Sequence, residues 1–170
     1  MSRYQLRIGV CDLVLPFETD PSFRERIEGV HHAFSRSPLV FGDDTVVHTG
    51  DSLEEGYERS LDYFADWNGE VTGVTCYNDL VALEVMKGLR ERSLSVPDDV
   101  SIIGFDDLKL LDYFPILLTT IQVPKYEMGR RATKLLLDQI DSGTDGSAEQ
   151  IELNAELVVR SSTAPPSEKR

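Results

Sequence analysis

The stretch VSIIGFDD, residues 100–107, ends with two adjacent carboxylates, Asp106 and Asp107. The run before them holds four apolar side chains in six residues, which indicates a buried strand. Carboxylates held at a strand end can accept hydrogen bonds from the hydroxyl groups of a small polar molecule. Asp106 is the stronger candidate for such a contact because it lies nearer the strand, whereas Asp107 could cap the loop that follows.

Two earlier strand-like runs also end in short polar side chains. Asn78 and Asp79 follow the run VTGVTCY, and Asp51 and Ser52 follow TVVHTG. We expect one residue of the Asn78–Asp79 pair to cap the helix that comes next. If these strands are parallel, their carboxyl ends lie along one edge of the sheet, where ligands bind. The polar groups would then line one crevice.

Two arginines, Arg24 and Arg26, open the first helical segment at the same expected edge. The simplest interpretation of these side chains is a solvated helix face. A forked guanidinium beside an acid-lined crevice would also suit the hydroxyl groups of a sugar or a phosphate.

Strand-like and helical patterns alternate along the chain. Strand patterns occupy residues 6–11, 45–49, 71–77 and 100–105. Helical patterns occupy residues 21–36, 52–67 and 79–93, the last with Leu80, Leu83, Met86 and Leu89 on one face. Then follow a β-prone run at 117–123, a helix at 125–140 and a β-prone run at 149–162. This alternation predicts an α/β fold, in which a parallel sheet is flanked by helices.

The chain has 170 residues, 30 of them acidic and 17 basic, and a net charge of −13. This length is typical of one domain, and we expect the negative charge to repel nucleic acid. No apolar run approaches the length of about 20 residues that spans a bilayer, and the start carries no signal-peptide pattern. Cys11 and Cys76 lie in apolar runs, so we interpret them as reduced core residues of a cytoplasmic protein. A disulfide between the two cysteines is the alternative.

The sequence carries no nucleophile elbow, no P-loop and no histidine cluster with metal-ligand spacing. His31 and His32 are adjacent on a predicted helix, so they cannot face one ligand together. We therefore predict no metal, no cofactor and no enzymatic activity. The enzymatic alternative is an enzyme that uses the aspartates at the strand ends to hold a metal ion.

The segment TGVTCYNDLVALEVMKGLRERSLSVPDDVSIIGFDDLKLLDYFPILLTTIQVPKYEMGRRATKLLLDQI, followed by ELVVRSSTAPP, closely resembles the effector-binding region of the lactose/galactose-repressor family. The earlier segment SFRERIEGV fits the same pattern, so the resemblance covers nearly the whole chain. It implies a type I periplasmic-binding-protein-like fold, in which two α/β subdomains enclose a cleft.

The resemblance also implies boundaries within the chain. Residues 1–123 would be the C-terminal effector-binding subdomain, and residues 124–153 a returning segment of the N-terminal subdomain. Residues 154–164 would return as a strand, and residues 165–170 would form a disordered tail. The helix-turn-helix headpiece and most of the N-terminal subdomain have no counterpart here, so we expect a fragment or an engineered piece.

By the same resemblance, Arg26, Asn78 and Asp106 match the family's main polar contacts to its effector. Asp51 falls where many relatives place an aromatic ring that stacks on the ligand. An acid there favours a hydroxyl-rich ligand or a cation. Ser93 stands where relatives usually have a glycine that ends a helix, and it would carry strain if its backbone is left-handed.

The stretch LKLLDYFP, residues 108–115, is unusually apolar for a loop. It could pack against the protein's own sheet. The resemblance instead implies a homodimer interface, built from this loop and the helix before it. The residues expected there are Leu83, Met86, Lys87, Leu110, Leu111, Tyr113 and Phe114.

The function that the resemblance implies is the effector-sensing and dimerisation region of a transcriptional regulator, most commonly a repressor. Its partners would be a small-molecule effector such as a carbohydrate, a second copy of the chain, and operator DNA through the missing headpiece. The location would be cytoplasmic, with no membrane contact. The alternatives are a solute-binding protein of a sugar transporter and a stand-alone module for binding a small molecule or a protein.

Overall fold

The computed structural model describes residues 7–12, 21–37, 46–48, 53–69, 71–142 and 149–165. Six strands form one sheet in the order β2-β1-β3-β4-β5-β6. They are β1 (Arg7–Asp12), β2 (Val46–His48), β3 (Val71–Cys76), β4 (Ser101–Asp106), β5 (Thr119–Gln122) and β6 (Glu156–Val158). The first five strands run parallel to their neighbours, and β6 pairs antiparallel with β5.

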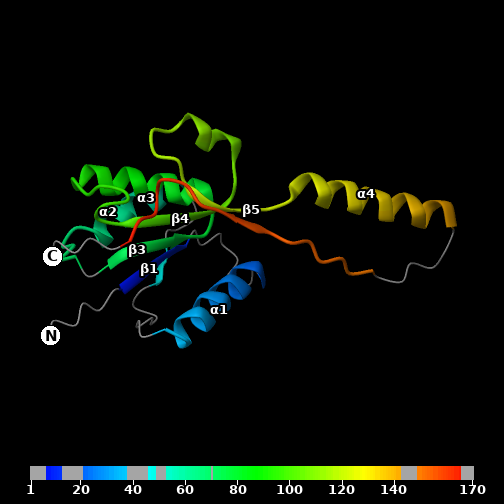
Figure 1. Ribbon diagram of the computed structural model, residues 1–170, viewed down its shortest axis with the longest axis horizontal. Coiled ribbons are helices and arrows are strands. Elements are labelled where there is room, and N and C mark those ends of the chain that lie inside the picture. The colour runs from blue at the N-terminus through cyan, green and yellow to red at the C-terminus, as the bar shows by residue number, and fades with distance from the viewer. Residues whose placement is uncertain are drawn as a thin grey trace.

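The described helices either pack on this sheet or extend from it (Figure 1). They are α1 (Pro21–Ser35), α2 (Leu53–Tyr63), α3 (Asp79–Glu91) and α4 (Lys125–Ser142), with a short 3-10 helix, η2 (Lys109–Tyr113). Helix α1 lies on one face of the sheet, and α2 and α3 lie on the other (Figure 1). The predicted α/β fold is confirmed. The sequence did not indicate the antiparallel direction of the short strand β6, nor the 3-10 turn within the apolar loop.

The core lies between the sheet and the α2–α3 layer. Its largest fully buried side chains include Phe64, Leu89, Ile102, Leu111 and Leu118. At Gly88 a Cβ atom would overlap the Ser60 side chain, so the glycine permits the close approach of α2 and α3.

The buried face of α3 only partly coincides with the apolar face noted in the sequence. Its buried apolar side chains are Val81, Ala82, Val85 and Leu89, whereas Leu80, Leu83 and Met86 are only half-buried. Leu89 alone is common to both sets. Small and β-branched residues fill the tight space against α2 and the sheet, and the larger Leu83 and Met86 pack at the margin of the core.

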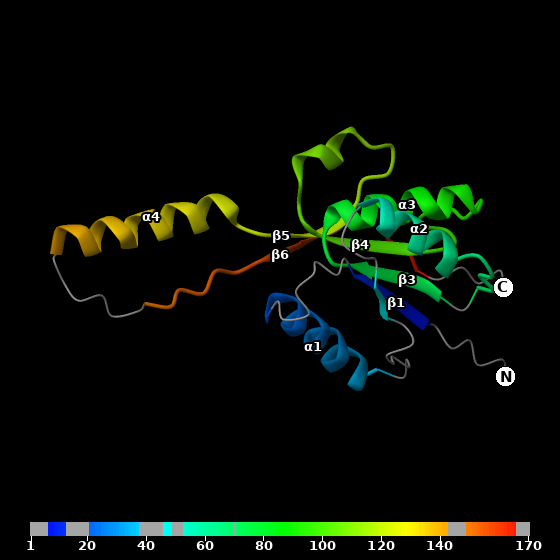
Figure 2. The same ribbon diagram turned by 180° about the vertical axis from the view of Figure 1, so that it is seen from behind.

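Helix α4 and residues 149–155 project from the sheet as an arm, which both views show (Figures 1 and 2). Several apolar side chains of α4 are exposed, namely Met128, Leu136, Leu137 and Ile140. No helix in the described ranges is both long enough and apolar enough to cross a bilayer.

Candidate functional site

The carboxyl ends of the parallel strands face the arm. Strand β5 runs through Val123 and Pro124 directly into α4, and β1 to β4 point the same way because they are parallel to it. Asn78 follows β3, and Asp106 ends β4. The structure therefore places both predicted residues at the edge where open α/β sheets bind ligands.

Arg26 joins α1 to this edge. Its Nη1 atom donates a hydrogen bond to the carbonyl oxygen of Tyr77 at 2.6 Å. Its guanidinium carbon lies 4.6 Å from the ring centroid of Tyr77 and 3.8 Å from that of Phe105. Two aromatic faces hold the cation in place. Arg26 therefore contacts the residues that immediately precede Asn78 and Asp106.

Asn78 is the N-cap of α3. Its backbone is extended, with φ −148° and ψ 178°, and its Oδ1 atom accepts the Val81 N–H at 2.9 Å. The expectation that one residue of the Asn78–Asp79 pair caps this helix is confirmed for Asn78. The cap uses the amide oxygen, so the amide nitrogen is the group that could donate to a ligand.

Asp106 and Asp107 share a strained turn. Both have positive φ angles, 112° and 54°, which non-glycine residues seldom adopt. The Asp106 carboxylate keeps 34% of its surface exposed and lies 3.9 Å from the Lys125 ammonium. Lys125 also donates a hydrogen bond to the carbonyl oxygen of Asp106. Strain of this kind gathers at binding sites, where the surrounding structure must hold it.

A cleft of about 580 Å³ lies between this edge and the arm. This volume is within the range of small-molecule sites. The body contributes Glu25, Arg26 and Phe105, and the arm side contributes Val123, Pro124, Met128, Ile151, Leu153 and Ala155. Asp51, the fourth predicted effector contact, and its neighbour Ser52 lie outside the described residues.

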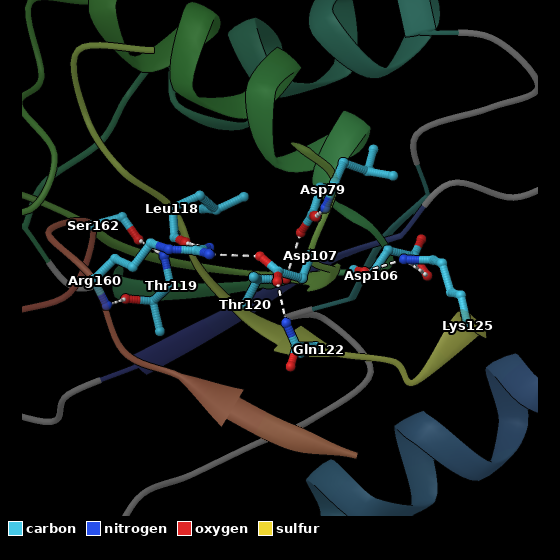
Figure 3. A network of polar contacts seen from close by, with 11 residues as sticks. Asp79, Asp106, Asp107, Leu118, Thr119, Thr120, Gln122, Lys125, Arg160 and Ser162 are labelled. Carbon is cyan, nitrogen blue, oxygen red and sulfur yellow. Dashed lines mark hydrogen bonds and ion pairs between the residues drawn. The ribbon is translucent and has the colours of Figure 1, made fainter. Parts of the chain in front are cut away.

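Asp79, expected either to line the crevice or to cap α3, is a buried carboxylate that does neither. Its Oδ1 atom accepts the Thr120 hydroxyl at 2.5 Å, and its Oδ2 atom accepts the Leu108 N–H at 2.8 Å. Burial raises the pKa of Asp79, the two hydrogen bonds oppose this, and the charges of Asp106 and Asp107 add to the rise. The side chain links α3 to strand β5 and to the loop after β4 (Figure 3).

Asp107 does not cap its loop. It forms an ion pair with Arg160, whose Nη2 atom lies 2.6 Å from the Asp107 Oδ1 atom. The Oδ2 atom accepts a hydrogen bond from Gln122 Nε2, also at 2.6 Å (Figure 3). Burial alone would raise the pKa of Asp107, but the bonds from Arg160 and Gln122 outweigh it and lower the pKa. Nothing in the β-prone run VVRSS marks Arg160 as the partner of Asp107, so the sequence did not predict this ion pair.

A second hollow, about 600 Å³ in volume, lies between α3 and the loop after η2. It is lined by four of the residues expected at a dimer interface, Leu83, Met86, Lys87 and Phe114. Leu110 and Tyr113 are 51% and 86% exposed. The expectation that Leu111 lies at the dimer interface is wrong, because this side chain is only 1% exposed and belongs to the chain's own core. Its side chain has no surface to offer to a second copy.

Residues 6–163 match the sequence family described as the periplasmic binding protein-like domain. The chain belongs to this family.

Its relatives include transcriptional repressors. The HTH-type transcriptional repressor CytR of Escherichia coli is 34% identical over 146 residues, which are 86% of this chain and 42% of CytR. PurR of Vibrio vulnificus is 32% identical over 81% of this chain and 40% of its own length. A LacI family regulator from Enterococcus faecium, solved with bound ribose, is 31% identical with a TM-score of 0.80. That match covers 94% of this chain and 57% of the regulator.

The resemblance to the effector-binding region of the lactose/galactose-repressor family is thereby confirmed. The chain spans about two fifths of the length of the curated repressors that it matches. These relatives are named as repressors and not as enzymes.

No group of three or more His, Cys, Asp or Glu side chains in the part of the chain that the structure describes could hold a metal ion. Cys76 is buried in the core, and its backbone is the register partner of Cys11 in the neighbouring strand β1.

Proposed function

We propose that this chain is the effector-sensing and dimerisation region of a DNA-binding transcriptional regulator, a repressor that responds to a sugar or a similar small metabolite. Support comes from relatives named as repressors and from a structural neighbour that holds ribose. On this proposal the chain is neither an enzyme nor dependent on a cofactor.

The observation that carries the proposal is the placement of Arg26, Asn78 and Asp106 at one edge of the sheet, where Arg26 also lines the cleft. Together these side chains offer a charged forked donor, an amide donor and a carboxylate acceptor. Such a set suits a neutral molecule with several hydroxyl groups, because hydroxyls both donate and accept. The cleft walls supply the apolar contact area that a sugar ring needs.

The proposed mechanism uses the arm. Residues 1–123 would form the effector-binding subdomain, residues 124–153 part of a second subdomain, and residues 154–164 the returning strand, followed by a tail at 165–170. A ligand that touches both sides of the cleft would favour its closed state. Only a difference in affinity between the open and closed states can shift their populations.

The remaining partners belong to the same proposal. A second copy of the chain would pack on the hollow beside α3, and operator DNA would be bound by a separate part of the regulator. The regulator would act in the cytoplasm, where its DNA lies. A transport protein or a stand-alone binding module would bind the same ligand without any effect on DNA.

A thermal-shift titration with neutral monosaccharides and nucleosides, beginning with D-ribose, tests the site. We expect at least one of these to raise the melting temperature of the wild-type chain. Arg26→Met and Asp106→Asn should weaken that ligand's binding roughly ten- to hundredfold, since a hydrogen bond to a charged group contributes about 1.5–3 kcal/mol.

Arg24→Met is the matched control, because Arg24 is an exposed arginine of the same helix. A ligand that binds all four proteins equally would contradict the assigned site. In the regulator, the same ligand should release operator DNA from the wild type but not from Arg26→Met. Binding without any release would favour the transport or stand-alone alternatives.

A further inference from the structure

The two adjacent aspartates at the end of β4 have different surroundings. The Asp106 side chain is 34% exposed and follows Phe105 of the cleft lining, whereas that of Asp107 is 7% exposed and paired with Arg160, itself only 19% exposed. A mostly buried, directly hydrogen-bonded pair is screened far less than a surface ion pair. Removing one partner would leave the other charge buried and unpaired.

Arg160 is held by more than its ion pair. Its Nη1 atom donates to the carbonyl oxygen of Leu118 at 2.9 Å, and its backbone N–H donates to the Thr119 hydroxyl at 2.9 Å. Leu118 and Thr119 lie at the start of β5, while Arg160 follows β6. The guanidinium is therefore fixed against the two strands that lead into and out of the arm.

Asp107 contacts both of these strands. Arg160 binds its Oδ1 atom from the β6 side, and Gln122 at the end of β5 binds its Oδ2 atom. Figure 3 shows the Asp107 carboxylate between these two donors. The next residue, Leu108, is fixed through its N–H to Asp79. The strained turn is thus tied on both sides, one residue away from Asp106.

We infer that Asp107 and Arg160 are positioning residues for the proposed effector site: their ion pair holds the strained turn that presents Asp106 to the cleft and ties this turn to strands β5 and β6. The inference rests on the proposed function for the role of Asp106. Neither residue lines the cleft, which Phe105 reaches just before Asp106, so both would act on the site through the turn that carries Asp106.

Amide exchange of Leu108 tests whether the pair holds the turn. We expect Arg160→Met to speed the exchange of the Leu108 N–H at least tenfold, while the amides of Val85 and Leu89 in α3 change less than twofold. Arg160→Lys keeps the charge but cannot reach Asp107 and Leu118 with a forked group, so its effect should be intermediate. Arg160→Lys also provides the test if Arg160→Met does not fold.

Two further variants make this test specific. Arg131→Met breaks an ion pair of similar length with Glu127 on the exposed surface of α4, and it should leave Leu108 exchange unchanged. Asp107→Asn combined with Arg160→Met should speed Leu108 exchange no more than Arg160→Met alone, because both changes remove the same contact and the asparagine leaves no unpaired buried charge. Unchanged Leu108 exchange in Arg160→Met, or multiplied effects in the double variant, would overturn the inference.

Calorimetric titration with D-ribose tests the consequence at the site. We expect Arg160→Met and Arg160→Lys to raise the Kd of D-ribose while Arg131→Met does not. Failure of the proposed function looks different, since Asp106→Asn would then also leave D-ribose binding unchanged. If the wild type does not bind D-ribose, the Leu108 exchange rates alone decide whether the pair positions the turn.

Discussion

Ser93 ends helix α3 in a conformation that favours glycine. Its φ angle is 60°, and it lies at the C′ position of a Schellman motif. The Leu94 N–H donates to the Leu89 carbonyl at 2.9 Å, and the Ser93 N–H donates to the Arg90 carbonyl at 3.0 Å. The sequence resemblance predicted strain here if the backbone proved to be left-handed, and that backbone conformation is confirmed. Replacing this serine should therefore stabilise the fold.

The expected gain follows from two opposing terms. A left-handed conformation costs an L-residue about 1–2 kcal/mol, which Ser93→Gly would remove. Glycine in turn gives the unfolded chain extra conformational freedom, which costs about 0.5–1 kcal/mol on folding. Ser93 is exposed, so no buried contact is lost. The net result is a stabilisation of about 0.5–1 kcal/mol.

Urea unfolding followed by circular dichroism measures this change. With an m value of about 1–3 kcal/mol/M, the midpoint should rise by a few tenths of a molar without a change in m. Ser93→Ala is the control, because alanine keeps the strain and loses only the hydroxyl. A midpoint that stays constant or falls in Ser93→Gly, or that rises equally in Ser93→Ala, would refute the strain argument.

Two other predictions concern the buried acid and the dimer. A raised pKa means that folded Asp79 binds its proton more tightly than unfolded Asp79, so its contribution to stability is greatest below the unfolded pKa of about 3.8 and is lost as pH rises through the folded pKa. Asp79→Asn should remove this loss of stability at higher pH. The urea midpoint of Asp79→Asn minus that of the wild type should therefore increase from pH 4 to pH 8. A difference that stays constant would contradict a raised pKa of Asp79. Analytical sedimentation should show the wild type as a dimer and Met86→Glu as a monomer, because the glutamate puts a charge into the apolar hollow beside α3. The control variant Glu58→Lys, on the exposed surface of α2, should remain a dimer. A dimeric Met86→Glu would exclude this face as the interface.

Local patterns predicted the elements and the strand ends of this fold. The alternation of apolar runs and helical spacing indicated the sheet, and the position of Asn78 before a helical run indicated a cap. Local patterns did not predict which face of α3 is buried. That face depends on how closely α2 approaches, which the small residue Gly88 permits. The resemblance, rather than any periodicity, selected Arg26 from two arginines on the same helix.

The partners of the buried acids could not be predicted from local patterns. Asp107 and Arg160 are 53 residues apart in sequence, and Asp79 and Thr120 are 41 apart. Their contacts depend on the register of β5 against β4 and β6, which no short stretch of sequence specifies. The sequence alone shows two adjacent aspartates, and which of them is buried depends on that register.

The division of roles between Asp106 and Asp107 follows from the turn itself. Two successive positive φ angles rotate the chain, so that the Asp106 carboxylate stays partly exposed near Lys125, whereas the Asp107 carboxylate faces Arg160 and the strands that carry the arm. A ligand that engages Asp106 therefore acts on a turn that is already tied to β5 and β6. In the proposed regulator, any preference of the ligand for one orientation of this turn would also be a preference for one position of the arm. Such a difference in affinity is what effector control requires.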